Sequence, residues 1–278
     1  MINDQAAALR QMKLEMEKER EKESPETFLA TVPHPCNIMA ISLIMPDEYE
    51  SLFPPIIDWL PQAMNRKAKS CLWDQAGLAQ NMVLNGKAGT LRYRMIETIE
   101  SEKHSLSVRP AQNDFAQIIK DSANERVSFL KHIVHDLKQF SEVWISVKSS
   151  ELKEYNSIIQ CSDAICIMVP PDHDSVLKCY EAVKNIKATG YSSPISLLEF
   201  SKTNSLNKQL LSDRIKNVAK NFLGLDLIGS GMVLSNITYE APENYSCLGD
   251  KIASISVKER DFLYVLSESI LYQIPGMI

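Results

Sequence analysis

The sequence predicts an α/β domain built on a doubly wound, mostly parallel β-sheet. Short apolar runs alternate with stretches of helical periodicity, the pattern of parallel strands joined by crossover helices. A chain of 278 residues with 45% hydrophobic residues is long enough to bury such a core. The runs that we expect to be strands lie at 37 to 44, 70 to 73, 142 to 147, 164 to 169 and 194 to 200. The stretches that we expect to be helices lie at 112 to 140, 174 to 188, 207 to 222 and 259 to 274.

The amino-terminal segment differs from this pattern. Residues 3 to 23 contain no Gly or Pro and are rich in Ala, Leu, Met, Glu, Lys and Arg, which predicts a helix. Its glutamates and lysines allow pairs four residues apart, but no broad apolar face is present, so we expect this helix to project. The expected organisation is therefore a projecting helix (1 to 24), a linker (25 to 35) and an α/β domain (36 to 278).

Composition and charge exclude some classes of function. Thirty Lys and Arg against 35 Asp and Glu give a net charge of −5, so the chain as a whole lacks the electrostatic footprint of a nucleic-acid binder. Nine glycines are few for an enzyme with glycine-rich phosphate loops. The six cysteines form no Cys-x-x-Cys pair, which predicts buried thiols in a reducing compartment. No signal peptide or membrane span is evident, so we expect a cytoplasmic protein.

The start of the chain carries its most informative motif, Asp4-Gln5-Ala6-Ala7-Ala8-Leu9-Arg10. It resembles the DQAxxLR activator motif of the FlhG/FleN proteins, MinD-like regulators of flagellar number and placement. The resemblance implies a helix that docks on the signal-recognition-type GTPase FlhF, with Gln5 completing the GTPase site. A glutamine amide can orient the water that attacks the γ-phosphate. Leu9 would anchor the helix, and Asp4 and Arg10 would set its register.

Three later segments resemble a MinD-type ATPase in the same order along the chain. Residues 71 to 86 resemble the family's second strand and its loop, LLLDADLGLANVDVLLG. Residues 163 to 171 resemble the strand DEVIVVTTPEP, and residues 221 to 229 resemble the step RFLGVPLEYLG. Together these matches cover most of residues 36 to 235, so the resemblance implies a MinD-like fold.

The departures from that family concern its nucleotide site. Where the family has KGGVGKT after the first strand, this chain reads Ser42-Leu43-Ile44-Met45-Pro46-Asp47-Glu48-Tyr49-Glu50. This stretch has no glycine or lysine, and its three acids would repel a triphosphate. The second aspartate of the family's DxD falls on Ala76 or is deleted, although Asp74 is kept. The magnesium aspartate falls on Val147, and the asparagine that binds adenine falls near Phe200. We therefore expect a pseudo-ATPase with no cofactor and no metal, and a monomer, because ATP drives dimerisation in that family.

Other candidate features have simpler interpretations. Asp172-His173-Asp174 follows an expected strand, where open α/β sheets place ligands, but we expect Asp174 or Ser175 to cap the next helix. His132 and His135 lie three residues apart without an adjacent Glu or Cys partner, so surface histidines are favoured over a zinc site. The final helix carries three acids against two cations on its polar face, which favours docking on the domain over membrane contact or a partner groove.

The sequence thus predicts a non-catalytic binding module that presents its amino-terminal helix to an FlhF-like GTPase or another protein partner. Its expected role is the number or placement of flagella or a related polar organelle, with recruitment to a cell pole. One alternative is a scaffold or adaptor that binds without activating the GTPase. The other is an enzyme that uses the loops at Asp74 and at Asp172 to Asp174.

Overall fold

The computed structural model describes the parts of the chain that form the sheet and most of the helices around it. These parts are residues 24–33, 37–47, 56, 59–61, 63–64, 69–79, 96–100, 105–111, 115, 118, 120–172, 174–201, 211–233 and 261–272. The expected projecting helix, with Asp4, Gln5, Leu9 and Arg10, lies outside the described residues.

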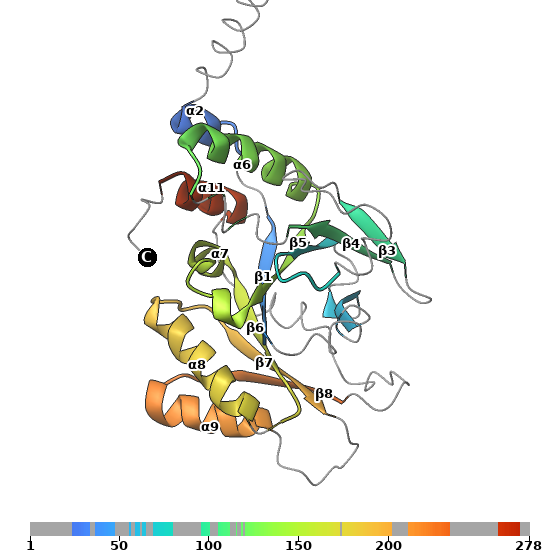
Figure 1. The fold of residues 1–278 in the computed structure, drawn as a ribbon, viewed down its shortest axis with the longest axis vertical. Coiled ribbons are helices and arrows are strands. Elements are labelled where there is room, and N and C mark those ends of the chain that lie inside the picture. The colour runs from blue at the N-terminus through green and yellow to red at the C-terminus, as the bar shows by residue number, and fades with distance from the viewer. Residues whose placement is uncertain are drawn as a thin grey trace, which may run out of the picture.

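The centre of the molecule is an eight-stranded sheet with strand order β3-β4-β2-β5-β1-β6-β7-β8 (Figure 1). Strands β4, β2, β5, β1, β6, β7 and β8 run parallel, and β3 pairs antiparallel with β4 at one edge. The strands are β1 (Met39–Met45), β2 (Ser70–Asp74), β3 (Glu97–Glu100), β4 (Ser105–Pro110), β5 (Glu142–Lys148), β6 (Ala164–Val169), β7 (Ile195–Ser201) and β8 (Ile228–Val233). Crossovers run in both directions from β1, which makes the sheet doubly wound.

Both faces of the sheet are buried, and successive residues of a strand belong to opposite faces. In β6, Ile165, Ile167 and Val169 belong to one apolar cluster. Ala164, Cys166 and Met168, which alternate with them, belong to the other. Burial on both faces is the reason that the central strands read as continuous apolar runs rather than as alternating ones.

Most of the described helices cover one face. They are α2 (Pro25–Leu29), α6 (Ala123–Leu137), the 3-10 helix η2 (Ser149–Glu151), α7 (Asn156–Cys161), α8 (Asp174–Ala188), α9 (Leu211–Leu223) and α11 (Phe262–Tyr272). The opposite face is packed by side chains from the connection between β1 and β2, among them Ile56 and Leu60. Helix α6 begins with a capping box, in which the Ser122 and Glu125 side chains each bond the backbone N–H of the other.

The expected α/β class and parallel sheet are confirmed, and all five expected strands are present with ends shifted by at most two residues. The helices expected at 174 to 188, 207 to 222 and 259 to 274 correspond to α8, α9 and α11. The helix expected at 112 to 140 is interrupted: Phe115 and Ile118 are helical, a turn follows at 120 and 121, and α6 then runs from Ala123 to Leu137. Strands β3, β4 and β8 were not predicted. The expected burial of thiols is confirmed for Cys71, Cys161, Cys166 and Cys179, all of which are free.

The segment 25 to 35, expected as a linker, contains the docked helix α2. The Ser24 hydroxyl caps it, and Pro25 occupies a first-turn position, where its missing N–H costs nothing. Phe28, Leu29 and Val32 are buried in the same apolar cluster as α6 and α11. Helix α2 therefore fixes the root of the amino-terminal segment beside those two helices (Figure 1).

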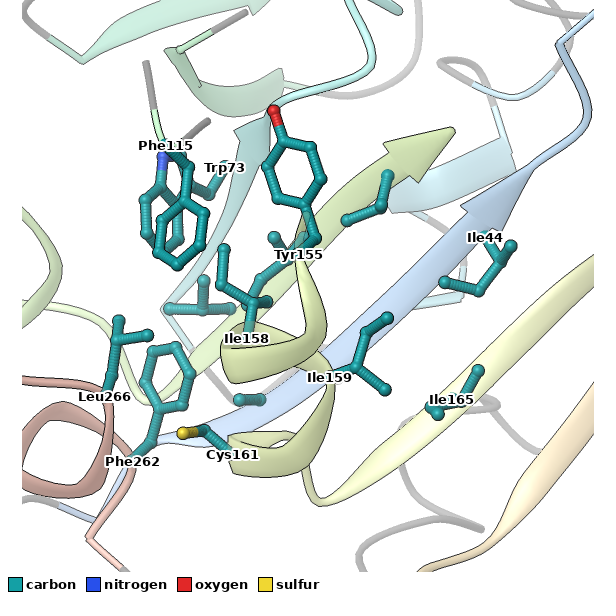
Figure 2. Close-up of a cluster of buried hydrophobic side chains, with 14 of the residues drawn as sticks. Ile44, Trp73, Phe115, Tyr155, Ile158, Ile159, Cys161, Ile165, Phe262 and Leu266 are labelled. Carbon is teal, nitrogen blue, oxygen red and sulfur yellow. The ribbon is translucent and has the colours of Figure 1, made fainter. Parts of the chain in front are cut away.

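Helix α11 packs on the domain, as the sequence predicts. Figure 2 shows Phe262 and Leu266 beside Ile158 and Cys161 of α7, in the apolar cluster that also reaches β1 and β6. The Arg126 guanidinium of α6 donates to the carbonyl of Ile270 at 3.1 Å, which places a cation near the carboxyl end of α11. Within the described part of the chain, no helix has the length and hydrophobicity needed to cross a membrane.

The docking of α11 makes a testable contribution to stability. Leu266 is fully buried, whereas Leu177 on α8 is 64% exposed. We expect Leu266→Ala to lower the free energy of unfolding by about 2 to 5 kcal/mol through lost burial and the cavity left behind. Leu177→Ala, the same change at an exposed site, should shift it by less than about 0.5 kcal/mol. Urea unfolding of both variants measures the difference, and equal effects would contradict the docked position of α11.

Candidate functional site

The carboxyl edge of a parallel sheet, at its topological switch point, is where α/β folds place their ligands. In this protein the loop after β1 places Asp47 beside the start of η2, which follows β5. One oxygen of Asp47 accepts from the Ser149 hydroxyl at 2.9 Å and from the Ser150 N–H at 3.1 Å. The other accepts from the Ser150 hydroxyl at 2.6 Å. A carboxylate therefore ties together the segments that follow β1 and β5.

The loop after β2 is organised in the same way by Asp74, which is 2% exposed. Its carboxylate accepts from the backbone N–H groups of Gly77, Leu78 and Ala79 at 2.9 to 3.0 Å. It also accepts from the Ser146 hydroxyl of β5 at 2.6 Å. Burial raises the pKa of the Asp74 carboxyl, and these four donors oppose that shift. The turn depends on Gly77, whose φ of 80° is in the left-handed region that glycine adopts without strain.

Gln75, the next residue, is fully buried and links the loops after β2 and β4. Its amide nitrogen donates to the carbonyl of Ala111 at 2.6 Å, and its oxygen accepts from the Trp73 indole N–H at 2.7 Å. The ring of Tyr155 stacks on Phe115 with centroids 5.4 Å apart, close to this amide. These contacts fill the region behind Asp74 with side chains of the core.

Two more carboxylates bond the first backbone amides of helices α8 and α9. Asp172 accepts from the N–H of Ser175 at 2.8 Å, so it is Asp172 whose side chain caps the first turn of α8, and the expected caps Asp174 and Ser175 were wrong. Glu199 of β7, 5% exposed, accepts from the N–H groups of Leu211 and Ser212 at 3.0 and 2.9 Å. Both helix starts are therefore bonded to an anion that the chain itself supplies.

Across the edge, the chain's own carboxylates accept hydrogen bonds from backbone N–H groups of the loop after β2 and of the starts of η2, α8 and α9. In a nucleotide site such groups and the start of a helix would be donors to phosphate oxygens. Here their hydrogen atoms point at Asp47, Asp74, Asp172 and Glu199. A phosphate at this edge would have to displace an internal anion and then lie near its charge.

Three positions of this chain align with catalytic groups of the resembled family. The structure describes the side chains at two of them, and both are apolar residues of the core. Val147, aligned with the magnesium aspartate, is fully buried in the main apolar cluster. Ala76, aligned with the second aspartate of DxD, is 2% exposed and donates its N–H to the Ser146 hydroxyl. Phe200 lies in β7, and its side chain is outside the described part.

A cavity of about 240 Å³ opens at this edge, between the ends of β1 and β5 and the flank of α8. It is lined by Pro46, Asp47, Ser149, Ser150, Lys178, Glu181, Ala182 and Asn185. Sites for drug-sized ligands usually measure about 300 to 1,000 Å³, so this cavity is small for a cofactor. Asp47 and Glu181 face it with negative charge, and Lys178 brings one positive charge.

The two predicted surface histidines are exposed on α6, and His173 lies outside the described residues. Among the side chains that the structure describes, no group of three or more His, Cys, Asp or Glu is arranged to hold a metal ion. The structure brings Asp74 and Asp172 to the same edge of the sheet, each bonded within its own loop.

Sequence reasoning missed the roles of Asp47 and Glu199. A signal was present, because an acidic residue lies within three residues of the carboxyl end of four strands, at Asp47, Asp74, Asp172 and Glu199. Acids are depleted inside strands, so their recurrence at strand ends indicates caps for the loops that follow.

Comparisons with known proteins give structural likeness only. No protein-family model matches the sequence, and no curated protein matches it. Among solved structures, a ParA family ATPase from Chlorobium tepidum aligns with 85% of this chain and 99% of its own, at 15% identity and a TM-score of 0.44. The cell division protein MinD of Aquifex aeolicus aligns with 85% of this chain and 98% of its own, at 12% identity and a TM-score of 0.46. Apo McdA of Cyanothece aligns over 84% and 99%, at 13% identity and a TM-score of 0.48.

The loop after β2 provides a test of the internal carboxylates. Replacing Asp74 with Ala leaves the N–H groups of Gly77, Leu78 and Ala79 without their acceptor. Because each buried unpaired group costs about 1 kcal/mol or more, we expect the free energy of unfolding to fall by about 3 kcal/mol or more.

The matched control is Asp226→Ala, at a side chain that is 80% exposed and paired with Lys220 in a surface bridge. This change should cost less than about 1 kcal/mol. Chemical denaturation of both variants makes the comparison. An Asp74 variant as stable as the control would show that its carboxylate does not hold the loop.

Proposed function

We propose that this chain is a non-catalytic, MinD/FlhG-like pseudo-ATPase that binds and activates a signal-recognition-type GTPase of the FlhF kind through its amino-terminal helix. In this proposal the protein regulates the number or placement of flagella or of a related polar organelle. The folded domain carries the helix and chooses the partner, and the chemistry takes place in the partner.

The single observation that carries the non-catalytic part is the occupation of the strand-end loops by internal carboxylates. The Ser150 N–H, the amides after Asp74 and the first amides of α9 each bond an Asp or a Glu of this chain. These groups would otherwise be available to phosphate oxygens. Asp74 is bonded to four donors, which also weighs against the alternative of an enzyme that uses this residue as a catalytic acid or base.

The activating part rests on the sequence motif from Asp4 to Arg10. A glutamine can both donate to and accept from an attacking water, so Gln5 has the chemistry to complete a GTPase site in trans. The docked helix α2 supports this arrangement, because burial of Phe28 and Leu29 fixes the root of the segment that bears Gln5. Without a nucleotide cycle of its own, the domain would be a constitutive effector.

The proposal is tested by the GTP hydrolysis rate of the signal-recognition-type GTPase from the same organism, with and without this protein at full length. We expect at least tenfold stimulation, about 1.4 kcal/mol off the barrier. Gln5→Ala should abolish the stimulation with no change in the thermal midpoint of the protein. Gln11→Ala, which lies in the same segment outside the motif, should retain it.

Binding without any stimulation by the wild-type protein would replace this proposal with the adaptor alternative. Stimulation that survives Gln5→Ala would remove the assigned role of the glutamine. Neither binding nor stimulation would contradict the choice of partner.

A further inference from the structure

A fully buried cation, Arg109 of β4, lies between the sheet and the last turn of α6. Its Nε–H donates to the Asp136 carboxylate of α6 at 2.9 Å. In the part of the chain that the structure describes, neither Nη1 nor Nη2 of Arg109 has an acceptor within hydrogen-bond distance. A guanidinium keeps its charge in proteins, and its two Nη atoms carry four of its five N–H bonds. Burying charged donors without acceptors is costly and uncommon in folded proteins, so these donors require an explanation.

A second buried arginine, Arg126 of α6, shows the usual arrangement. Its Nε–H donates to the carbonyl of Asp121 at 3.1 Å, and its Nη1 donates to the carbonyl of Ile270 at 3.1 Å. Protein acceptors therefore meet this guanidinium at both its Nε side and its Nη end. At Arg109 the described residues supply an acceptor at the Nε side and none at the Nη end.

The neighbours of Arg109 on β2 do not fill this role. The guanidinium carbon lies 6.0 Å from the centre of the Trp73 ring, a contact with the aromatic face that provides no acceptor in the plane of the N–H groups. Burial raises the pKa of the Cys71 thiol to about 12, so this side chain is not an anion. The charges of Arg109 and Lys69 lower that pKa, and the charge of Asp136 raises it. Two cations and one anion therefore act on this part of the core, which leaves its charge positive.

Asp136 marks the side from which a small solute can approach. Its side chain is 22% exposed, whereas that of Arg109 is fully buried. A solute that reaches the guanidinium would therefore pass beside a carboxylate in the last turn of α6. The negative charge of Asp136 would repel a dianion more strongly than a monoanion.

We propose that the Nη end of Arg109 binds a small monovalent carboxylate between β4 and α6. Two Nη atoms present parallel N–H groups that match the two oxygens of a carboxylate, and such bidentate pairs are among the strong hydrogen bonds of proteins. The bound ion would join β4 to α6 and stabilise the folded state, because the unfolded chain does not hold these donors together. This inference goes beyond the proposed function and does not rest on it, and its test needs no GTPase.

Thermal unfolding of the full-length protein in sodium formate, compared with sodium chloride at the same ionic strength, tests the proposal. We expect formate to raise the thermal midpoint by about 2 °C or more and to saturate, and chloride to give a smaller change that does not saturate. Arg109→Met removes the donors and should abolish the difference between the two salts. Arg126→Met, the same change at the buried arginine whose Nη end is bonded, should keep that difference.

Asp136→Asn leaves Arg109 in place and gives a prediction in the opposite direction. Loss of the carboxylate charge removes repulsion of the bound anion, so formate should half-saturate at a several-fold lower concentration than in wild type. The Nε–H resonance of Arg109 in nitrogen–proton NMR spectra should shift along the same titration.

Equal midpoints in formate and chloride would overturn the proposal, and so would a formate response that Arg109→Met retains. If Arg109→Met does not fold, the titrations of wild type and of Asp136→Asn decide. An unchanged half-saturation in Asp136→Asn together with an unmoved Nε–H resonance would overturn the proposal, because an arginine with a purely structural role predicts neither change.

Discussion

The carboxyl edge of the sheet is held together by carboxylates that accept backbone N–H groups from the loops that follow the strands. A buried carboxylate is tolerated only when donors surround it, and a buried loop is tolerated only when its N–H groups find acceptors. Asp74 meets both needs at once, since it accepts from three successive amides and from Ser146. Glu199 of β7 is also buried and accepts from the first amides of α9, whereas Asp47 is exposed and Asp172 half-buried where they accept from η2 and α8. The ordered shape of this edge follows from these bonds.

The same hydrogen bonds disfavour phosphate binding at the edge of the sheet where such a fold can bind a ligand. A parallel sheet with β1 between β5 and β6 provides a switch point where a ligand could bind. Negative charge at that point and the absence of lysine in the loop at 46 to 50 remove the attraction for a polyphosphate. Helices α2, α6 and α11 pack against one another and hold the root of the amino-terminal segment.

The central strands could be predicted from sequence because a strand that is buried on both faces consists of consecutive apolar residues, as in Ala164–Val169. Strands β3 and β8 lie at the edges of the sheet, and β3 reads Glu-Thr-Ile-Glu while β8 contains Gly229 and Gly231, so neither has that pattern. Strand β4 was not predicted because it contains Arg109, whose charge interrupts the apolar pattern. Arg109 is fully buried and forms a salt bridge with Asp136 of α6. That bond joins residues 27 positions apart, and no local pattern reveals it. At the candidate site, the sequence shows that residues 42 to 50 contain no lysine or glycine. It does not show which N–H groups bond Asp47 and Glu199, because these groups are distant in sequence and are brought near by the fold.

Isothermal titration of the full-length protein with magnesium-ATP tests the central claim most directly. If the internal carboxylates occupy the strand-end amides, no saturable heat of binding should be seen up to about 1 mM nucleotide, the concentration at which binding is worth only about 4 kcal/mol. Saturable binding at micromolar concentration, weakened by Ser150→Pro, which removes the N–H that Asp47 accepts, would contradict the account.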